Sequence, residues 1–349
     1  MHHASGTTTM PSSASGASSQ QPLQSSHINN QNNNGLIGDG FNNIVNSGNN
    51  NQVNQFNTTF HVATEEEEVV ELDRLFAGHV SKDALRNYFY SPPECHPNTR
   101  TTVRNEIGGW IDESESKKSP LLWLNGPAAV GKSVIAKTIS GFHDQIVATF
   151  FFSTSSDRSA ATLFPTLAWQ MARRIPGTRK HIIASLKNSG SLQTSQVEEQ
   201  FDVLIIQPLK KCSTTLKSRP VMVIDGADEC TDERMLLRFL RVLVQASEGG
   251  EMPVRFIVCS RPEPRIRAIL GSWPIDTLDT IRPHSVISTI QIGCSKECKE
   301  DIARYLTDKF SAIRQPGEGA GPWLQPCDIS ELAKASCGQF LYASTIVRL

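Results

Sequence analysis

The sequence predicts an α/β fold in which a mostly parallel β-sheet is covered by helices on both faces. From Leu121 onward, short apolar runs of strand length alternate with longer helical patterns, which is the order expected of βαβ units. One of these runs is followed by a glycine-rich turn and another by an acidic turn. In a parallel sheet, the turns that follow the strands lie at the carboxyl edge of the sheet. The expected strands are 121–124, 147–152, 221–224, 256–259 and 286–292. Helices are expected to begin at Ser133, Ala160, Glu233 and Glu263.

Residues 1–64 have the composition of a disordered segment. They contain one formally charged residue, Asp39, and consist largely of Ser, Thr, Gly, Asn and Gln. Such a segment buries too little apolar surface to offset the entropy of the chain. Within it, residues 35–60 place isolated Ile, Val and Phe among Asn, Gln and Gly, which also favours β-stacking between chains. A plain linker and a self-assembly segment both remain open.

Residues 65–118 form a predicted helical lead-in to the sheet. A helix is expected from Glu65, because acidic residues suit a helix N-terminus and the following apolar residues recur at helical spacing. Those apolar residues are Val69, Leu72, Leu75 and Phe76. The proline-rich stretch 91–97 ends this pattern, and residues 101–111 resume it.

Charge and composition exclude several kinds of partner. The chain has 34 basic and 35 acidic residues, so no global charge attracts nucleic acid or acidic lipid. It has no apolar run of about 18 residues and no secretory signal. The eight cysteines are scattered, and the C-x3-C pair Cys294 and Cys298 lacks the second pair of ligands that zinc requires. We expect a soluble cytoplasmic protein with free thiols that binds neither nucleic acid nor membranes.

The strongest motif is G-x4-G-K-[ST] at residues 126–133, set between a predicted strand and a predicted helix. Its glycines let successive backbone N–H groups turn toward a phosphate, and the helix N-terminus adds its dipole. Lys132 is expected to reach the β- and γ-phosphates, and Ser133 to ligate Mg²⁺. The candidate nucleotide-binding residues of this P-loop are Gly126, Pro127, Ala128, Ala129, Val130, Gly131, Lys132, Ser133 and Val134.

A second element places Asp225 at the end of the apolar strand 221–224, at the same sheet edge as the P-loop. An aspartate in this position holds Mg²⁺ in P-loop enzymes, while a nearby acid orients the attacking water. Asp228 and Glu229 are the candidates for that acid, and Glu229 is preferred. The sequence therefore predicts a Mg²⁺-dependent site for a nucleotide.

Arg261 follows the predicted strand 256–259 and should reach the same edge. A guanidinium there can distinguish a triphosphate from a diphosphate through a charge-assisted contact. The alternative is an arginine that is solvated on a loop or paired with Glu263. The candidate catalytic residues are Lys132, Asp225, Asp228, Glu229 and Arg261.

ATP and ADP are the expected nucleotides, because no guanine-reading [NT]-K-x-D tetrapeptide follows the P-loop. His96, Arg100 and Thr101 are candidate contacts to the base or ribose, although a turn without a ligand role is equally open. No arginine finger can be assigned, so at most slow, weak Mg²⁺-dependent ATP hydrolysis is expected.

The order of these segments resembles the NACHT NTPases of the STAND class that are abundant in mushroom-forming fungi, with their nephrocystin-like N-terminal domain. The resemblance rests on the stretches CHPNTR, LLWLNGPAAVGKSVIAKTI, ATFFFS, FPTLAWQ, VMVIDGADEC, FIVCSRPEPRIR, DIARYLTDKF and GQFLYASTIVRL. It implies an intracellular signalling or self-defence protein in which ADP favours a closed state and ATP an open one that self-assembles. The chain departs from its relatives at Ala129-Val130, where they often have Gly-Ala, and at Gly226-Ala227, where Ala-Leu is common.

The predicted organisation is a nucleotide-binding domain at 119–295 followed by C-terminal helices at 296–349. Within the latter, helices are expected at 299–310 and 328–349, the last still amphipathic where the chain ends. Relatives continue into a winged-helix region and a repeat array, so the chain is expected to be truncated. A nucleotide-stabilised scaffold without significant turnover is therefore the alternative to an ATP-dependent switch. A small-molecule kinase is less favoured, because no acceptor-binding lid is recognisable.

Overall fold

The computed structural model describes residues 63–89, 91–112, 119–154, 159–188, 196–250, 252–271, 286–313 and 325–349. The chain divides into two compact units, Met1–Phe60 and His61–Leu349, and all described residues belong to the second. The predictions for residues 1–64 therefore lie outside the described residues, except at Ala63 and Thr64.

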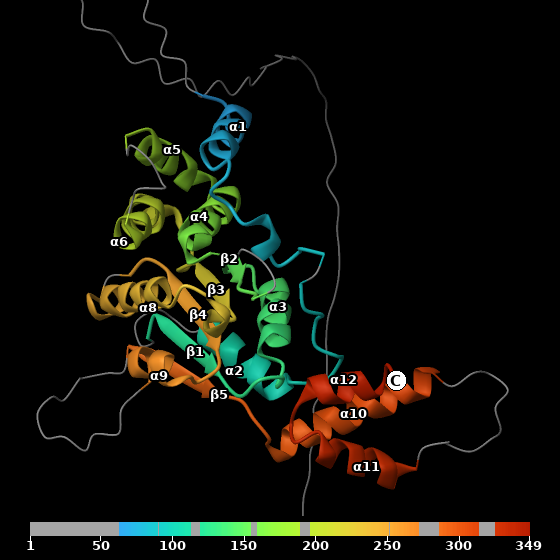
Figure 1. The fold of residues 1–349 in the computed structure, drawn as a ribbon. Helices are drawn as coiled ribbons and strands as arrows, with labels where there is room; N and C mark the ends of the chain where they lie inside the picture. Colours follow the sequence, from blue (N-terminus) through green and yellow to red (C-terminus); the bar gives the residue numbers. More distant parts are fainter. Residues whose placement is uncertain are drawn as a thin grey trace, which may run out of the picture. The chain divides into compact units, whose positions relative to one another are not determined.

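The centre of the second unit is a five-stranded sheet in the order β2-β3-β4-β1-β5, and all four strand pairings are parallel (Figure 1). The strands are β1 (Leu121–Asn125), β2 (Ile146–Phe151), β3 (Val221–Asp225), β4 (Arg255–Ser260) and β5 (Ile287–Gln291). Each lies within one or two residues of its predicted range. The predicted α/β fold with a parallel sheet is confirmed.

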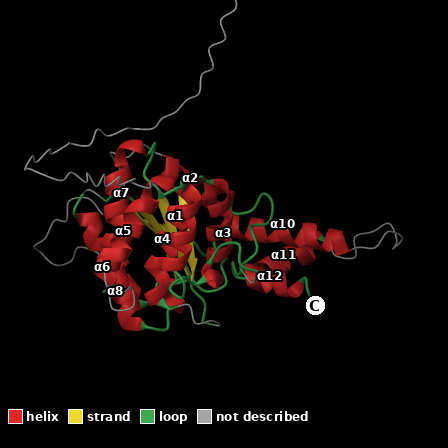
Figure 2. Cartoon of the chain, turned by 90° about the horizontal axis from the view of Figure 1, so that it is seen from above, coloured by secondary structure: helices red, strands yellow, loops and turns green. Residues whose placement is uncertain are grey.

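Helices cover both faces of the sheet (Figure 2). Successive strand residues point to opposite faces, so each strand contributes side chains to two separate cores. In β1, Leu122 and Leu124 pack in a core with α2 (Thr101–Asp112) and α3 (Lys132–Phe142). Trp123 belongs to the core on the other face. That face is covered by α1 (Glu65–Leu75), α4 (Leu163–Arg174), α5 (Arg179–Asn188), α6 (Val197–Phe201), α7 (Gln207–Cys212), α8 (Glu233–Glu248) and α9 (Pro264–Leu270).

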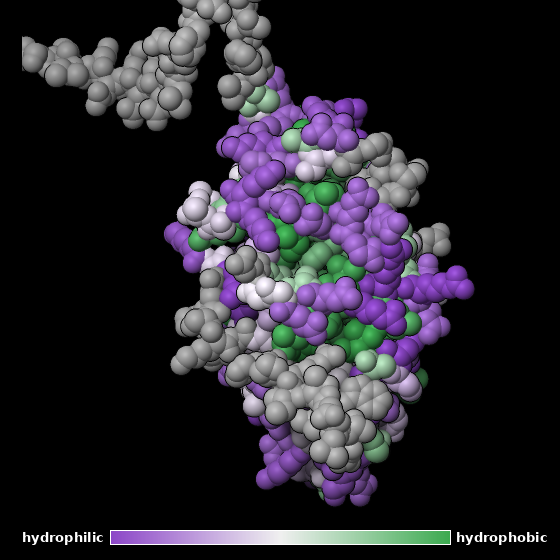
Figure 3. All heavy atoms as spheres, turned by 90° about the vertical axis from the view of Figure 1, so that its left-hand side faces the viewer, coloured by the Kyte–Doolittle hydropathy of each residue, from purple (hydrophilic) through white to green (hydrophobic). Residues whose placement is uncertain are grey.

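Two of these helices show how the sequence determines their ends and faces. Thr64 and Glu67 form a reciprocal capping box that starts α1, as the acidic run predicted. Helix α8 buries Leu236, Phe239 and Leu243 at helical spacing. The surface over α5, α6 and α8 is largely hydrophilic (Figure 3).

Helices α5, α6 and α7 were not predicted individually. Helix α6, a π-helical turn at Asp202–Ile206 and α7 follow one another without a break. Pro208, near the start of α7, has no N–H to donate to the preceding turn, which accounts for the locally widened helix. Short 3₁₀ turns lie at Lys82–Ala84, Ala160–Thr162, Pro176–Thr178, Ser213–Thr215 and Ala227–Glu229.

The C-terminal helices have a small core of their own, which includes Cys298, Ile302 and Leu306. They are α10 (Lys296–Ile313), α11 (Pro326–Ala335) and α12 (Phe340–Ile346). The prediction of a single helix over 328–349 is wrong. The chain turns at Gly338, whose φ is 82°, and a Cβ there would lie 2.8 Å from the Cα of Cys294. The left-handed backbone begins one residue earlier, at Cys337 with a φ of 48°, and these two left-handed residues end α11. In the described part of the chain, no helix is long and apolar enough to cross a membrane.

Candidate functional site

The P-loop connects β1 to α3 and is shaped by two glycines. A Cβ on Gly126 would lie 2.4 Å from the carbonyl oxygen of Ile292, so only glycine fits at this position. Gly131, immediately before α3, has a φ of 94°, which an L-residue with a side chain adopts only with strain. Pro127 and Ala128, at the tip of the loop, are exposed.

Ala129 has a left-handed backbone, with a φ of 65°. In an alanine this conformation costs about 1 kcal/mol, which glycine would avoid. The carbonyls of Ala129 and Val130 accept hydrogen bonds from residues outside the P-loop. The backbone N–H of Leu341 donates to the Ala129 carbonyl at 3.3 Å, and Nη2 of Arg100 donates to the Val130 carbonyl at 2.7 Å. The side chain of Val130 is buried in the core beneath the loop.

Lys132 closes the loop upon itself. Its Nζ donates to the carbonyl oxygens of Gly126 at 2.9 Å and Pro127 at 2.8 Å. Burial lowers the pKa of Lys132, while the nearby carboxylates of Asp228 and Asp225 oppose that shift. The Lys132 ammonium is thus held by two backbone carbonyls of the P-loop. Val134, two residues on, is half-buried.

Asp225 ends β3 as a buried carboxylate that is only 3% exposed. Burial raises the pKa of Asp225 to about 7, although a hydrogen bond from Ser133 and the charge of Lys132 act in the opposite direction. Its Oδ1 has no hydrogen-bond partner among the described residues. A buried acceptor without a partner is costly, and it calls for a cation or an ordered water.

This pair of side chains fits Mg²⁺. The ion prefers oxygen ligands, and proteins usually hold it through one or two carboxylates while substrate phosphates and waters complete its shell. The unpartnered oxygen of Asp225 and the hydroxyl of Ser133 provide such a partial set. Among the described residues, no group of three or more His, Cys, Asp or Glu side chains could hold a metal by itself.

Asp228 and Glu229 follow in the 3₁₀ turn that begins after Gly226, whose φ is 67°. Glycine adopts this left-handed conformation without the strain that a side chain would add. Glu229 Oε2 accepts a hydrogen bond from the backbone N–H of Thr154 at 3.3 Å, beyond the end of β2. Asp228 is buried and faces Arg261 instead.

Arg261 is paired with Asp228 and not with Glu263. Its backbone N–H donates to Oδ1 of Asp228 at 2.8 Å, and its Nε donates to Oδ2 at 2.6 Å. Glu263 binds Arg265 at 2.8 Å. Before Arg261, the buried Ser260 accepts a hydrogen bond from the indole of Trp123, which fixes the end of β4 against β1.

The sheet topology brings these charged side chains to one edge. Asn125 of β1 lies opposite Ser260 of β4, so Gly126 and Arg261 leave neighbouring strands at the same level. The charges of Asp225, Asp228 and Arg261 all act on Lys132. The predicted site residues of the P-loop, the acidic turn and the arginine turn are therefore close together.

His96 and Arg100 lie on the side of α10. The His96 ring is edge-on to Tyr305 at 5.3 Å between centroids, and its Nδ1 is 3.8 Å from Asp308. Arg100 is 6% exposed, and its backbone N–H donates to Asp301 at 2.8 Å. Thr101 is an exposed residue that starts α2.

Sequence reasoning missed the C-terminal residues that meet the P-loop. The guanidinium of Arg100 lies over the Phe340 ring, 4.8 Å from its centroid, and Leu341 bonds the loop through its backbone. Only the three-dimensional packing of α10 and α12 brings them there, and no local pattern in the sequence signals it.

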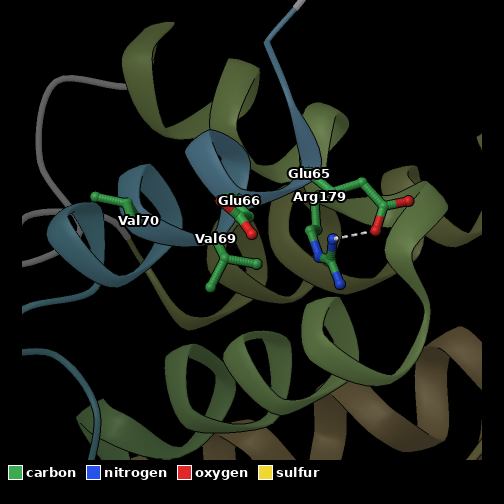
Figure 4. Close-up of a pocket in the computed structure, with 5 residues that line it drawn as sticks. All are labelled: Glu65, Glu66, Val69, Val70 and Arg179. Atoms are coloured by element: carbon green, nitrogen blue, oxygen red, sulfur yellow. Dashed lines mark ion pairs between the residues drawn. The ribbon is translucent and has the colours of Figure 1, made fainter.

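A separate pocket of about 450 Å³ lies between α1 and α5 (Figure 4). It is lined by Glu65, Glu66, Val69, Val70 and Arg179. The Arg179 guanidinium points toward Glu65, with Nη1 4.0 Å from the carboxylate. None of the predicted site residues lines this pocket.

Residues 101–261 match a protein-family model described as the N-terminal region of nephrocystin 3. The matched segment contains the P-loop, the acidic turn and Arg261. No curated protein matches the chain.

Three of the solved structures that are similar to this chain share little sequence identity with it. The Walker-type ATPase PABY2304 of Pyrococcus abyssi is 12% identical with a TM-score of 0.47, over 74% of this chain and 70% of that one. Cdc6p from Pyrobaculum aerophilum is 15% identical with a TM-score of 0.43, over 77% and 65%. PCH-2 of C. elegans is 14% identical with a TM-score of 0.34, over 79% and 64%. The chain thus spans about two thirds of the length of these proteins.

The family match and the P-loop in its strand-loop-helix setting agree with the parallel sheet. Together they support an α/β fold of the P-loop NTPase type with a nucleotide-binding motif.

Proposed function

We propose that this chain is an ATP-binding, slowly hydrolysing regulatory switch of the STAND class, from an intracellular signalling or self-defence protein of the fungal type. The observation that carries the proposal is the convergence of Lys132, Asp225 and Arg261 from three elements at one edge of the sheet. The proposed organisation is a helical lead-in at 65–118, the nucleotide-binding domain at 119–295 and the C-terminal helices at 296–349.

The P-loop residues 126–134 are assigned to the phosphates of ATP or ADP. Lys132 would exchange its two loop carbonyls for phosphate oxygens, and an anion would stabilise its charge where burial now disfavours it. Ser133 and Asp225 would hold Mg²⁺, which supplies positive charge next to the phosphates. Adenine remains the proposed base, because the guanine-reading tetrapeptide is missing after the P-loop.

Glu229 is the proposed residue that orients the attacking water. It follows Asp228 in the same turn, and because Asp228 is bound by Arg261, Glu229 is the acid of this turn whose carboxylate is not held by that arginine. Arg261 is assigned to the terminal phosphate. His96 and Arg100 contact the C-terminal helices, which supports a role in holding those helices near the nucleotide.

Binding of labelled ATP, ADP and GTP to the full chain tests the proposal. Lys132→Ala should weaken ATP and ADP binding at least about 100-fold, because a buried charge-assisted phosphate contact is lost. Lys187→Ala is the matched control, since that lysine of α5 pairs with Glu71 of α1 and with none of the proposed site residues. Equal affinities for ATP and GTP that do not depend on Lys132 would refute the proposal.

A nucleotide-stabilised scaffold is the second candidate. It is favoured by the hydrogen bond from Leu341 to the Ala129 carbonyl, through which a bound nucleotide could stabilise the packing of α12 without turnover. In that case Mg-ATP raises Tm but no phosphate is released. Steady phosphate release that is lost in Glu229→Gln supports the switch.

A further inference from the structure

Asp228 and Glu229 are neighbours in the sequence, but the structure gives them different partners. The side chain of Asp228 is 4% exposed, and both of its oxygens accept hydrogen bonds from Arg261. The Asp228 carbonyl also accepts a hydrogen bond from Arg265 at 3.2 Å. The carboxylate of Asp228 is therefore engaged in holding an arginine, and it has little capacity to orient a water.

The contact with Asp228 uses only one side of Arg261. The backbone N–H and Nε face the carboxylate, while the Arg261 side chain is 45% exposed. In the described part of the chain, no hydrogen bond from Nη1 or Nη2 of Arg261 is present. An arginine fork held by Nε keeps two terminal amino groups for a second anion, and phosphate suits that geometry.

The open end of Arg261 belongs to the edge that carries the P-loop. Arg261 follows Ser260, which lies opposite Asn125, the residue before Gly126. Its charge acts on Lys132 and lowers the pKa of that lysine. A phosphate bound by Lys132 would therefore also be attracted by the positive charge of Arg261.

Two features keep Arg261 on Asp228: the burial of the Asp228 carboxylate and the fixed position of the turn that carries it. A departing guanidinium would leave a buried carboxylate without its charged partner, which is costly. The turn that carries Asp228 is itself fixed by the hydrogen bond from the Glu229 N–H to the Gly226 carbonyl at 2.7 Å. Arg261 is therefore held in one orientation before a ligand binds.

We propose that Asp228 is a positioning residue that holds Arg261 so that its terminal amino groups recognise the third phosphate of a nucleoside triphosphate. The inference rests on the proposed nucleotide-binding function and deepens it. It assigns discrimination between triphosphate and diphosphate to the Asp228–Arg261 pair, and it leaves the role of the water-orienting acid to Glu229.

The ratio of ATP affinity to ADP affinity is the measurement that tests this role. Asp228→Asn preserves the size of the side chain but presents an amide N–H group or a weaker, neutral acceptor to Nε. ATP affinity should fall about tenfold or more, with ADP affinity changed less than about threefold, as expected for a charge-assisted contact made only by the third phosphate. Arg261→Gln should give the same result, and the double variant should lose little more.

Two further variants separate this role from its alternatives. Arg265→Ala removes a neighbouring arginine that donates hydrogen bonds to the Asp228 carbonyl and to Glu263 but not to the Asp228 carboxylate, so the affinity ratio should not change. Glu229→Gln should abolish phosphate release and leave the ratio unchanged. Retention of ADP binding in each variant shows that the site is folded.

The outcomes distinguish the inference from the proposed function. An unchanged ratio in Asp228→Asn, with phosphate release abolished, would make Asp228 the water-orienting acid and overturn the inference. Equal losses of ATP and ADP affinity would also overturn it, because they indicate only a structural role. If wild-type binding does not depend on Lys132, the proposed function itself fails.

Discussion

At the scale of single residues, the shape of the P-loop depends on how closely other backbone approaches it. Gly126 is in contact with the Ile292 carbonyl, which belongs to the segment that follows β5. That segment is in turn fixed by the hydrogen bond from the Ile292 N–H to the Asn125 carbonyl at 2.8 Å. Neither side of this contact can move without breaking the pairing of β1 with β5.

Gly126→Ala should therefore destabilise the protein by about 2 kcal/mol or more, as overpacking against fixed backbone does. The measurement is the free energy of unfolding in denaturant. Gly109→Ala is the control, because its Cβ would meet nothing within 4 Å on the exposed side of α2. That control should gain about 0.5 to 1 kcal/mol from helix propensity. A neutral Gly126→Ala would show that the loop relaxes freely.

Asp225 makes the stability of the nucleotide-free, metal-free protein dependent on pH. Its pKa is raised from 3.8 in the unfolded chain to about 7 in the fold, chiefly by burial. Between these values the folded state binds a proton that the unfolded state lacks. The contribution of Asp225 to stability is therefore greatest below pH 4, falls as the pH rises to 7, and stays low above it.

Asp225→Asn should remove this dependence and stabilise the empty protein at pH 8, by at most about 4 kcal/mol at 1.4 kcal/mol per pKa unit. At pH 4 the effect should be small. Thermal unfolding across this pH range is the measurement. Asp232→Asn serves as the control, because asparagine caps the start of α8 as well as aspartate does. Equal effects of Asp225→Asn at both pH values would contradict the prediction.

At the scale of elements, Arg100 connects three parts of the unit. Its backbone N–H binds Asp301 of α10, its guanidinium lies over Phe340 of α12, and Nη2 binds the Val130 carbonyl of the P-loop. Arg100 also has a left-handed backbone, with a φ of 56°, which a non-glycine residue adopts at a cost. The contacts of Arg100 with Asp301, Phe340 and the Val130 carbonyl offset the cost of this backbone conformation.

Arg100→Ala should loosen α10 and α12 against the P-loop and destabilise the fold by about 1 to 3 kcal/mol. Amide hydrogen exchange should become faster in both helices, with the sheet strands unchanged. Arg104→Ala is the control on the next turn of α2, since that arginine lies over the exposed Phe142 ring. Unchanged exchange in α12 would show that Arg100 does not hold that helix in place.

At the scale of the whole molecule, the strands and the P-loop were predictable, because each strand is a short apolar run and the motif is local. The break between α11 and α12 was not, since it combines the left-handed Cys337 and Gly338 with the close approach of Gly338 to the Cys294 backbone. The pairing of Asp228 with Arg261 joins residues 33 positions apart, and the sequence offered Glu263 as a nearer partner. Long-range packing decided both cases.

None of the eight cysteines forms a disulfide, so each carries a free thiol. The rate at which each thiol reacts therefore depends on how the protein packs around it. Cys294, Cys327 and Cys337 are exposed. The other five are buried, except that Cys95 is half-buried. Burial raises the pKa of these thiols, and a protonated, shielded thiol reacts slowly. These are Cys95, Cys212, Cys230, Cys259 and Cys298.

Alkylation of the native protein followed by mass spectrometry should therefore label three cysteines rapidly and five slowly. Denatured protein is the control, and there all eight should react at similar rates. Reductant should leave Tm unchanged, because no disulfide is broken. Cys259 and Cys298 are the most informative sites, since one lies beneath the P-loop and the other in the core of α10 to α12. Rapid labelling of either would show that the core around it opens readily in solution.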